Sequence, residues 1–254
     1  MILTRLGNKT KIAKDIIKHF PRHTTYVDVT FGAGGMFFNK PKAKYNIVND
    51  LDSDVFNLFQ VIINQKESLR EAFEIMPIHS DLLEYWKKNK EKDPIKKSLR
   101  FLLLSNFTYL GKGTNIRYGQ SNDKRMFLSR LDKTFNALQN VQFNNCDFER
   151  FLKSINFRCE KDKEKTFIYG DPPYIDTGSN YENKSWSKND FCRLLDACIA
   201  TGCKFAISEF NNEFVIKEAE KRELNIIYIG ERVNIKNRRT EILITNYKTE
   251  TTLF

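Results

Sequence analysis

The tetrapeptide Asp171-Pro172-Pro173-Tyr174 has the groups needed to recognise a planar base. It directly follows an apolar, β-rich run at 166–170, and open α/β sheets bind their ligands at the carboxyl ends of strands. Pro173 lacks an N–H, so the carbonyl of Pro172 can accept a hydrogen bond beside the Asp171 carboxylate. Two acceptors and the flat face of Tyr174 suit a base that bears an amino group. An ordinary proline turn after a strand is the alternative interpretation.

A second set of residues has the pattern of a nucleotide-type ligand site. A β-rich run ends near Asp28 and leads at once into a turn that contains Gly32 and Gly34, and Asp50 closes a second β-rich run about 20 residues later. Glycines let a ligand approach the backbone closely, and a carboxylate accepts hydrogen bonds from ribose hydroxyls. A tight turn in any α/β protein explains the glycines equally well.

Alternating short apolar runs and helical periodicity predict the elements that position these residues. In the first part of the chain we expect a helix at 11–20, a strand at 26–29 followed by a glycine turn and a helix from 36, a strand at 46–50 and a helix from 54 to 62. After residue 166 we expect strands at 166–170, 204–207, 225–229 and 241–245, and helices at 191–199 and 212–221. Parallel strands joined through helices form βαβ units, which predicts an α/β fold.

The middle of the chain differs from both ends. From 67 to 135 the sequence shows helical periodicity and a loop at 111–119, without a convincing strand. We therefore predict a catalytic domain formed by 1–60 and 136–254, with 61–135 as an inserted, mainly helical domain.

The composition predicts an intracellular globular protein without a structural metal site. The 254 residues include 41% apolar and 29% charged residues, and no run approaches the ~20 apolar residues that span a membrane. The amino terminus lacks a signal-peptide pattern. The five cysteines include no CxxC pair, which favours free thiols over a metal site. A net charge of +10 is compatible with a polyanionic partner, although many basic proteins bind none.

Several of these motifs, in chain order, resemble the Dam-type adenine methyltransferases, with the phage enzymes most similar. The matching positions are Gly7-Asn8-Lys9, Asp28 to Gly34, Asp50, Asp147 and Asp171 to Tyr174. The resemblance implies a Rossmann-like S-adenosylmethionine-dependent methyltransferase sheet with an inserted, mainly helical target-recognition domain. It also implies methyl transfer to the N6 amine of a flipped adenine in duplex DNA, with S-adenosylhomocysteine as the product and no metal.

The resemblance also assigns roles by position. Lys9 would meet the methionine portion of the cofactor, Asp50 its ribose hydroxyls and Asp147 its adenine. Asp171 and the Pro172 carbonyl would accept hydrogen bonds from the target amine, and Tyr174 would stack on the base. The complete predicted cofactor set is Arg5, Gly7, Lys9, Asp28, Gly32, Gly34, Asp50, Asp147 and Asp171.

Two basic segments are candidates for DNA contact, because lysines meet phosphates and arginine commonly reads guanine. The predicted DNA-binding residues are Lys112, Arg117, Tyr118, Lys124, Arg125, Tyr181, Arg238 and Arg239. A solvated basic face is the alternative. The insert has Gln120 to Arg125 where the family usually has an Asn/Thr-Pro-Phe-Gly stretch, so GATC is not assumed as the target.

The expected partner is double-stranded DNA, in the cytoplasm of a bacterial or phage-infected cell, with no membrane. A cognate restriction endonuclease would place the chain in a restriction-modification system, and we expect a monomer or weak dimer. Two alternatives remain open: an amino-methyltransferase acting on RNA or cytosine N4, and a catalytically silent DNA-binding relative. The chain has no Pro-Cys pair, which argues against methylation of the cytosine ring.

Overall fold

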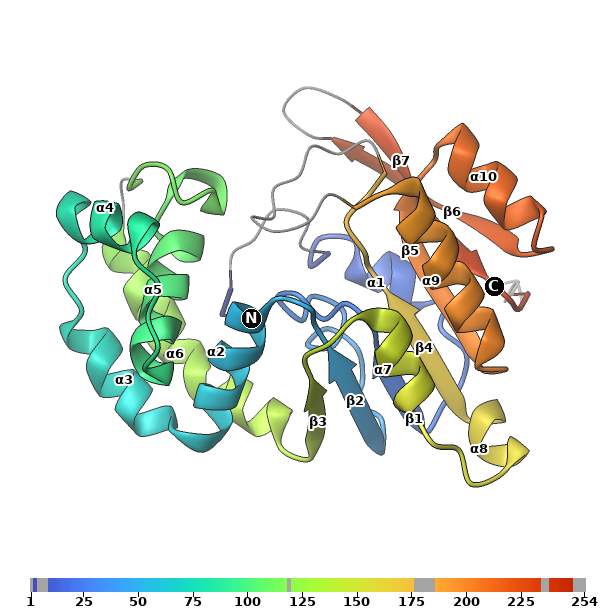
Figure 1. Cartoon of the computed structure of the whole chain (residues 1–254), viewed down its shortest axis with the longest axis horizontal. Helices are drawn as coiled ribbons and strands as arrows, with labels where there is room; N and C mark the ends of the chain where they lie inside the picture. The colour runs from blue at the N-terminus through green and yellow to red at the C-terminus, as the bar shows by residue number, and fades with distance from the viewer. Residues whose placement is uncertain (1, 4–8, 118–119, 176–185, 234–237, 249–254) are drawn as a thin grey trace. The chain divides into compact units, whose positions relative to one another are not determined.

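The computed structural model describes residues 2–3, 9–117, 120–175, 186–233 and 238–248 (Figure 1). The chain forms two compact units. The helical unit comprises Met1–Lys11, Gly32–Phe38 and Asp52–Val141, and the sheet unit comprises Ile12–Phe31, Asn39–Leu51 and Gln142–Phe254. Within the described residues, no helix combines the length and the apolar character that a membrane span requires.

The sheet has seven strands in the order β3-β2-β1-β4-β5-β7-β6. The strands are β1 Thr25–Asp28, β2 Tyr45–Asn49, β3 Val141–Asn144, β4 Thr166–Gly170, β5 Lys204–Phe210, β6 Asn225–Val233 and β7 Arg238–Thr245. β1 pairs in parallel with β2 and β4, and β4 with β5, whereas β7 is antiparallel to both β5 and β6. Because the chain runs outward from β1 in one direction and from β4 in the other, the switch point lies between their carboxyl ends, where open sheets bind ligands.

Alternation along the strands gives the sheet two buried faces. On one face Val27, Ile168 and Phe205 belong to the main core, together with side chains of α7 and α9, which lie side by side in front of the sheet (Figure 1). On the other face the Phe20 ring packs 4.5 Å from the ring of Phe167. The helices of this unit are α1 Ala13–Ile17, α7 Phe148–Ser154, α8 Glu160–Glu164, α9 Lys188–Ala200 and α10 Glu213–Glu220.

The helical unit has its own aromatic core. Its elements are α2 Ser53–Asn64, α3 Lys66–Ile75, α4 Ser80–Lys88, α5 Pro94–Asn106, the 3₁₀ turn η1 Tyr109–Gly111 and α6 Gln120–Leu138. Phe73 on α3 packs 4.2 Å from Phe127 on α6, measured between ring centroids. Asp52 caps α2 by accepting from the Asp54 N–H at 2.9 Å, which satisfies a donor that the first turn leaves unpaired.

Most predicted elements are confirmed, with one clear error. The strand expected at 166–170 is β4, and the helix expected at 191–199 lies within α9. The helix expected from residue 36 is wrong: residues 35–39 form turns, and Pro41 disfavours the helical conformation in the residue before it. Gly32 and Gly34 form the preceding turn with positive φ angles of 53° and 72°. The sequence did not predict β3, α7 or α8.

The predicted domain boundary at 60–61 falls inside α2. This helix is continuous and packs against α5 of the helical unit, and the structure groups the whole of it there. The helical unit also takes in the glycine turn and the amino-terminal segment, which the sequence analysis placed with the catalytic domain.

Candidate active site

The carboxyl ends of three parallel strands bring the loops after Asp28, Asn49 and Gly170 together within the sheet unit. Backbone groups tie these loops to one another. The Asp171 N–H donates to Thr30 Oγ1 at 2.7 Å, the Val29 N–H to the Tyr169 carbonyl at 2.9 Å, and the Phe31 N–H to the Asn49 carbonyl at 2.9 Å. The predicted catalytic loop therefore starts from a position fixed by its neighbour strand at the switch point.

Asn49 ties the loop after β1 to the loop after β3. Its side chain is buried, and its amide donates to the carbonyls of Val29 at 3.2 Å and Cys146 at 3.0 Å. Its oxygen accepts from the Cys146 N–H at 3.1 Å. Sequence reasoning missed this residue, because its partners lie 20 and 97 positions away in the chain.

Replacing Asn49 by leucine is expected to lower the free energy of unfolding by about 2–3 kcal/mol, because three backbone groups, one buried and two partly buried, lose their partner. Asn145→Leu is the matched control. Asn145 is exposed, and its amide donates to the Asp50 carbonyl at 2.7 Å, so we expect its replacement to cost less than about 1 kcal/mol. Urea denaturation measures both, and equal losses in the two variants would contradict the role of Asn49.

Asp28 is a buried carboxylate beside the catalytic loop. It is 2% exposed, its Oδ2 accepts from the Tyr26 hydroxyl at 2.9 Å, and its Oδ1 has no hydrogen-bond partner among the described residues. Burial raises its pKa to about 7, and repulsion from Asp171 and Asp50 acts in the same direction, whereas hydrogen bonds from the Tyr26 hydroxyl and the Thr30 backbone oppose it. The buried Lys40 ammonium lies 4.0 Å from the centre of the Tyr26 ring, and burial lowers its pKa to about 8. A positive group placed beside Asp28 would favour its ionised form.

Tyr174 is anchored by its hydroxyl. The hydroxyl donates to Glu241 on β7, and the ring meets the Phe210 ring edge-on, 4.5 Å between centroids. The next residue, Ile175, donates its N–H to Glu209 on β5 at 3.1 Å. Neither glutamate was identified from the sequence, although Glu241 directly precedes an apolar run at 242–244 and Glu209 lies between Ser208 and Phe210 in β5. Buried charges are rare unless they are paired.

Other predicted cofactor residues are placed less centrally. Asp147 caps α7, accepting from the Glu149 N–H at 3.0 Å, and pairs with Arg193 at 3.3 Å. Lys9, which is 2% exposed, lies in the helical unit, as do Gly32 and Gly34. Arg5, Gly7, Tyr118 and Tyr181, and the side chain of Arg238, lie outside the described residues.

The structure describes the side chains of five of the predicted DNA-binding residues. Lys112 and Arg125 are exposed. Arg117 donates to the Asn106 carbonyl at 3.1 Å and pairs with Asp123, and Lys124 donates to the carbonyls of Glu74 and Met76. In the sheet unit, the Arg239 guanidinium lies 5.4 Å from the centre of the Phe210 ring.

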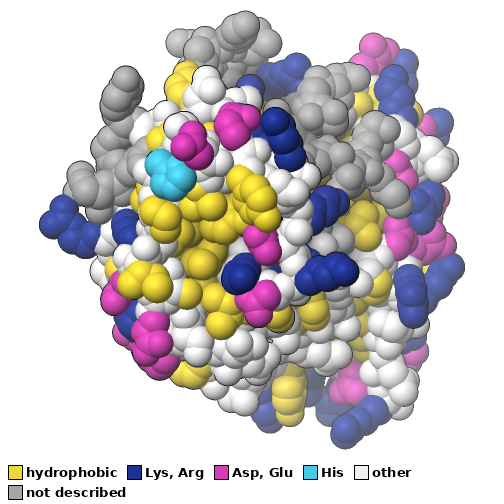
Figure 2. Space-filling view, turned by 60° about the vertical axis from the view of Figure 1, so that its left-hand side comes forward, with side chains coloured by type: hydrophobic (Ala, Val, Ile, Leu, Met, Phe, Trp, Pro, Cys, Tyr) yellow, Lys and Arg dark blue, Asp and Glu magenta, His cyan; other side chains and the backbone are white. Residues whose placement is uncertain are grey.

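One face of the molecule has hydrophobic side chains gathered around a hollow, with basic and acidic side chains near its edge (Figure 2). Within the helical unit, Lys124 and Arg125 line a recess together with Arg70 and Asp132. Arg70 and Asp132 form an ion pair at 2.8 Å. The positive charge of this recess is therefore partly neutralised.

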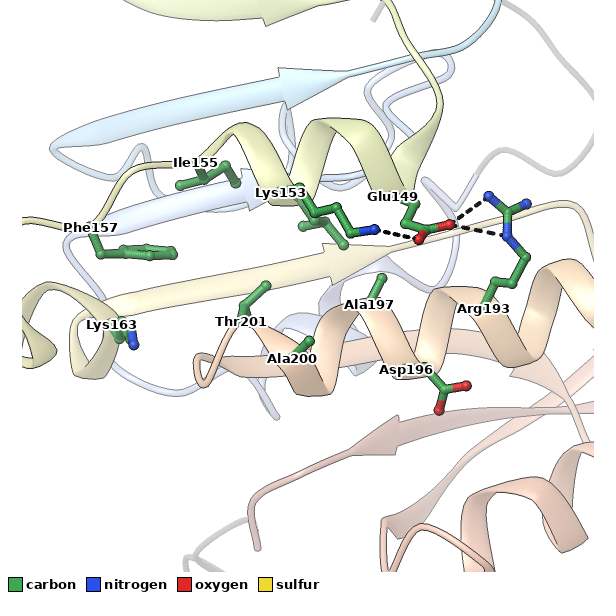
Figure 3. A pocket seen from close by; sticks show the side chains of 11 residues that line it. Glu149, Lys153, Ile155, Phe157, Lys163, Arg193, Asp196, Ala197, Ala200 and Thr201 are labelled. Atoms are coloured by element: carbon green, nitrogen blue, oxygen red, sulfur yellow. Dashed lines mark hydrogen bonds and ion pairs between the residues drawn. The ribbon is translucent and has the colours of Figure 1, made fainter.

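The sheet unit has a separate groove between α7 and α9 (Figure 3). It has a volume of about 510 Å³ and an apolar lining that includes Leu152 and Ala197. At one end Glu149 pairs with Lys153 at 2.7 Å and with Arg193 at 2.8 Å. None of the predicted catalytic or cofactor residues lines this groove.

All five cysteines are unbridged, two of them buried. Among the residues that the structure describes, no cluster of three or more histidine, cysteine, aspartate or glutamate side chains could hold a metal ion.

Comparisons with known proteins match almost the whole chain. The model of the D12 class N6 adenine-specific DNA methyltransferase family matches residues 6–242. The modification methylase StsI of Streptococcus sanguinis is 26% identical over 288 residues, which cover 98% of this chain and 43% of that protein. The DNA adenine methylase of Escherichia coli K12 is 23% identical over 76% of this chain and 72% of its own length. The type II methyltransferase M.MjaIII of Methanocaldococcus jannaschii is 25% identical over 95% and 96% of the two chains.

The chain thus spans less than half the length of StsI. These relatives are bacterial and archaeal, and a greater similarity to phage enzymes stays a prediction. Among solved structures, the N-terminal domain of human METTL16 in complex with SAH aligns over 93% of this chain and 68% of that one, with 9% identity and a TM-score of 0.42. A likeness at this level says nothing further about the site.

Proposed function

Because the chain belongs to the D12 class of N6 adenine-specific DNA methyltransferases, we propose that it transfers a methyl group from S-adenosylmethionine to the N6 amine of a flipped adenine in duplex DNA. The observation that supports this most directly is the placement of the loop 171–174. It begins at the switch point of the sheet, bound to Thr30, and two buried glutamates hold its far end.

The acidic character of this edge suits a cationic cofactor. S-adenosylmethionine supplies, when bound, a methyl group activated by a positively charged sulfur. Asp28, which is buried and has a raised pKa, would gain from a nearby positive charge. Asp50 directly follows β2, and we expect it to accept hydrogen bonds from ribose hydroxyls. Lys9, Gly32, Gly34 and Asp147 remain predicted cofactor contacts.

The proposed role of the loop 171–174 is to make the target amine a better nucleophile. An adenine amine is a poor nucleophile, since its lone pair is delocalised into the ring. Asp171 and the Pro172 carbonyl would accept from its two N–H bonds, which favours the localised, pyramidal form that attacks the methyl group in line. Tyr174 would hold the base by stacking once it leaves the duplex.

Double-stranded DNA is the proposed partner, met by Lys112, Arg125 and Arg239 among others. A cognate restriction endonuclease, a monomeric or weakly dimeric state and a cytoplasmic location belong to the same proposal. The relatives named as modification methylases support the restriction-modification context.

The test is an assay of the purified protein with methyl-labelled S-adenosylmethionine and unmethylated bacterial DNA, digested to nucleosides for identification of the product. We expect the label in 6-methyladenine. Equal amounts of ribosomal RNA serve as the matched substrate control. Label in cytosine or in RNA, or no transfer at all, would contradict the proposal.

A further inference from the structure

Two glutamates with no solvent exposure bind the segment that follows the catalytic prolines. Glu241 on β7 accepts from the Tyr174 hydroxyl, and Glu209 on β5 accepts from the Ile175 N–H at 3.1 Å. Glu209 also accepts from the Phe210 N–H at 2.8 Å. Buried carboxylates are costly unless such donors satisfy them, so their presence here calls for a specific use.

The two glutamates reach the segment from opposite faces of the sheet. Successive side chains of a strand alternate between faces, so Glu209 and Phe210 point to different sides of β5. Glu241 is opposite Phe210 in the register of β5 and β7, and therefore shares the Phe210 side. Tyr174 and Ile175 are thus bound on either side of the end of β5.

Phe210 connects Tyr174 to a basic side chain, Arg239. The Tyr174 ring is 8% exposed and meets the Phe210 ring at an interplanar angle of 86°. On Phe210 lies the guanidinium of Arg239, at 5.4 Å. A polar contact at the hydroxyl and an aromatic contact at the ring therefore both orient Tyr174.

We infer that Glu209 and Glu241 are positioning residues for methyl transfer: they hold Tyr174 and Ile175 so that the Tyr174 ring and the Pro172 carbonyl keep the geometry that the target base requires. The inference rests on the proposed function of the loop. Neither glutamate touches the base in this scheme. Their effect reaches the reaction through Tyr174 and the backbone, because small misplacements of binding groups are costly in rate.

The test is a double-mutant cycle on the full chain, with kcat for DNA methylation as the readout. Tyr174→Phe keeps the stacking ring and removes the anchor, so we expect kcat to fall about tenfold. Glu241→Gln replaces a charge-assisted bond by a neutral one, and a fall of about threefold is expected. Since both changes act on one bond, the combined variant should be no slower than Tyr174→Phe alone.

Two further measurements separate positioning from general damage. The Kd for S-adenosylmethionine should change by less than about twofold in each variant, and Glu218→Gln, a change at a largely buried glutamate on α10, should leave kcat unchanged. Multiplying effects in the combined variant, or wild-type kcat in Tyr174→Phe, would overturn the inference.

Amide hydrogen exchange tests the hydrogen bond from the Ile175 N–H to Glu209 independently of activity. Exchange of the Ile175 amide should quicken about tenfold in Glu209→Gln and stay unchanged in Glu218→Gln. If the wild type does not methylate adenine, the proposed function fails, and this exchange measurement still decides whether the glutamates hold the segment. Unchanged exchange in Glu209→Gln would refute the positioning role itself.

Discussion

Asp171→Asn is expected to lower kcat for adenine methylation by about 100- to 1000-fold, a loss typical of removing one preorganised electrostatic contact to a transition state. As the target amine attacks, it develops positive charge, and the Asp171 carboxylate would stabilise that charge while accepting one N–H. Asparagine keeps the size of the side chain but loses the charge and presents an N–H donor in place of one acceptor. The KM for S-adenosylmethionine should change much less than kcat, because the loss falls mainly on the transition state.

Asp196→Asn is the matched control for this variant. The same Asp-to-Asn substitution is made on α9, where the Asp196 side chain is 61% exposed and pairs with Arg222. We expect wild-type kcat for it. An Asp171→Asn enzyme within about fivefold of the wild type would show that the carboxylate does not act on the amine.

Local sequence patterns were enough to predict six of the seven strands of the sheet. A run such as 166–170 is uniformly buried in the structure, and its apolar, β-rich composition indicates that without knowledge of its neighbours. β3 was missed because only four residues form it and none of them is fully buried, so it lacks an apolar pattern. The helix expected from residue 36 failed for a local reason, since Pro41 leaves too few residues after the glycine turn for a helix.

The part of the site that could be predicted lies within one short segment of the sequence, 171–174. Asp171 and Tyr174 stand three residues apart, and their chemistry can be inferred from adjacency. The residues that hold them cannot, because Glu241 is 67 positions from Tyr174 and Glu209 is 34 positions from Ile175. Their pairing follows from strand order, and β7 lies between β5 and β6 contrary to chain order. A glutamate beside an apolar run, such as Glu241 before 242–244, is a sequence signal for a buried, paired charge.

Asp28 should make the stability of the protein fall as pH rises from about 4 to about 7. Its pKa is about 7 in the folded chain against an ordinary 3.8, so between these values the folded state binds the proton and the unfolded state has lost it. This contribution is fully present below pH 3.8 and is lost as pH passes the folded pKa. Its size is about 2–4 kcal/mol.

Asp28→Asn removes this titration, since asparagine resembles the protonated acid. The variant should therefore be more stable than the wild type at pH 7.5 by about 1–3 kcal/mol, and the advantage should shrink toward zero at pH 4.5. Urea denaturation at both pH values measures the difference in free energy of unfolding between the variant and the wild type. Titration of Lys40 and other groups affects both proteins and therefore largely cancels in this difference. A difference independent of pH would show that Asp28 does not change its protonation in this range.

The same carboxylate would link stability to cofactor binding if Asp28 lies at the proposed cofactor site. If a cationic ligand binds beside Asp28, it favours the ionised form, so binding should tighten as pH rises through 7. We expect the Kd for S-adenosylmethionine to be at least about threefold lower at pH 8 than at pH 6 in the wild type, and nearly constant in Asp28→Asn. Calorimetric titration measures both. If Asp28→Asn is more stable but binds S-adenosylmethionine more weakly, then the Asp28 carboxylate destabilises the fold and stabilises the bound cofactor. A Kd that does not depend on pH would show that the positive charge of the ligand lies away from Asp28.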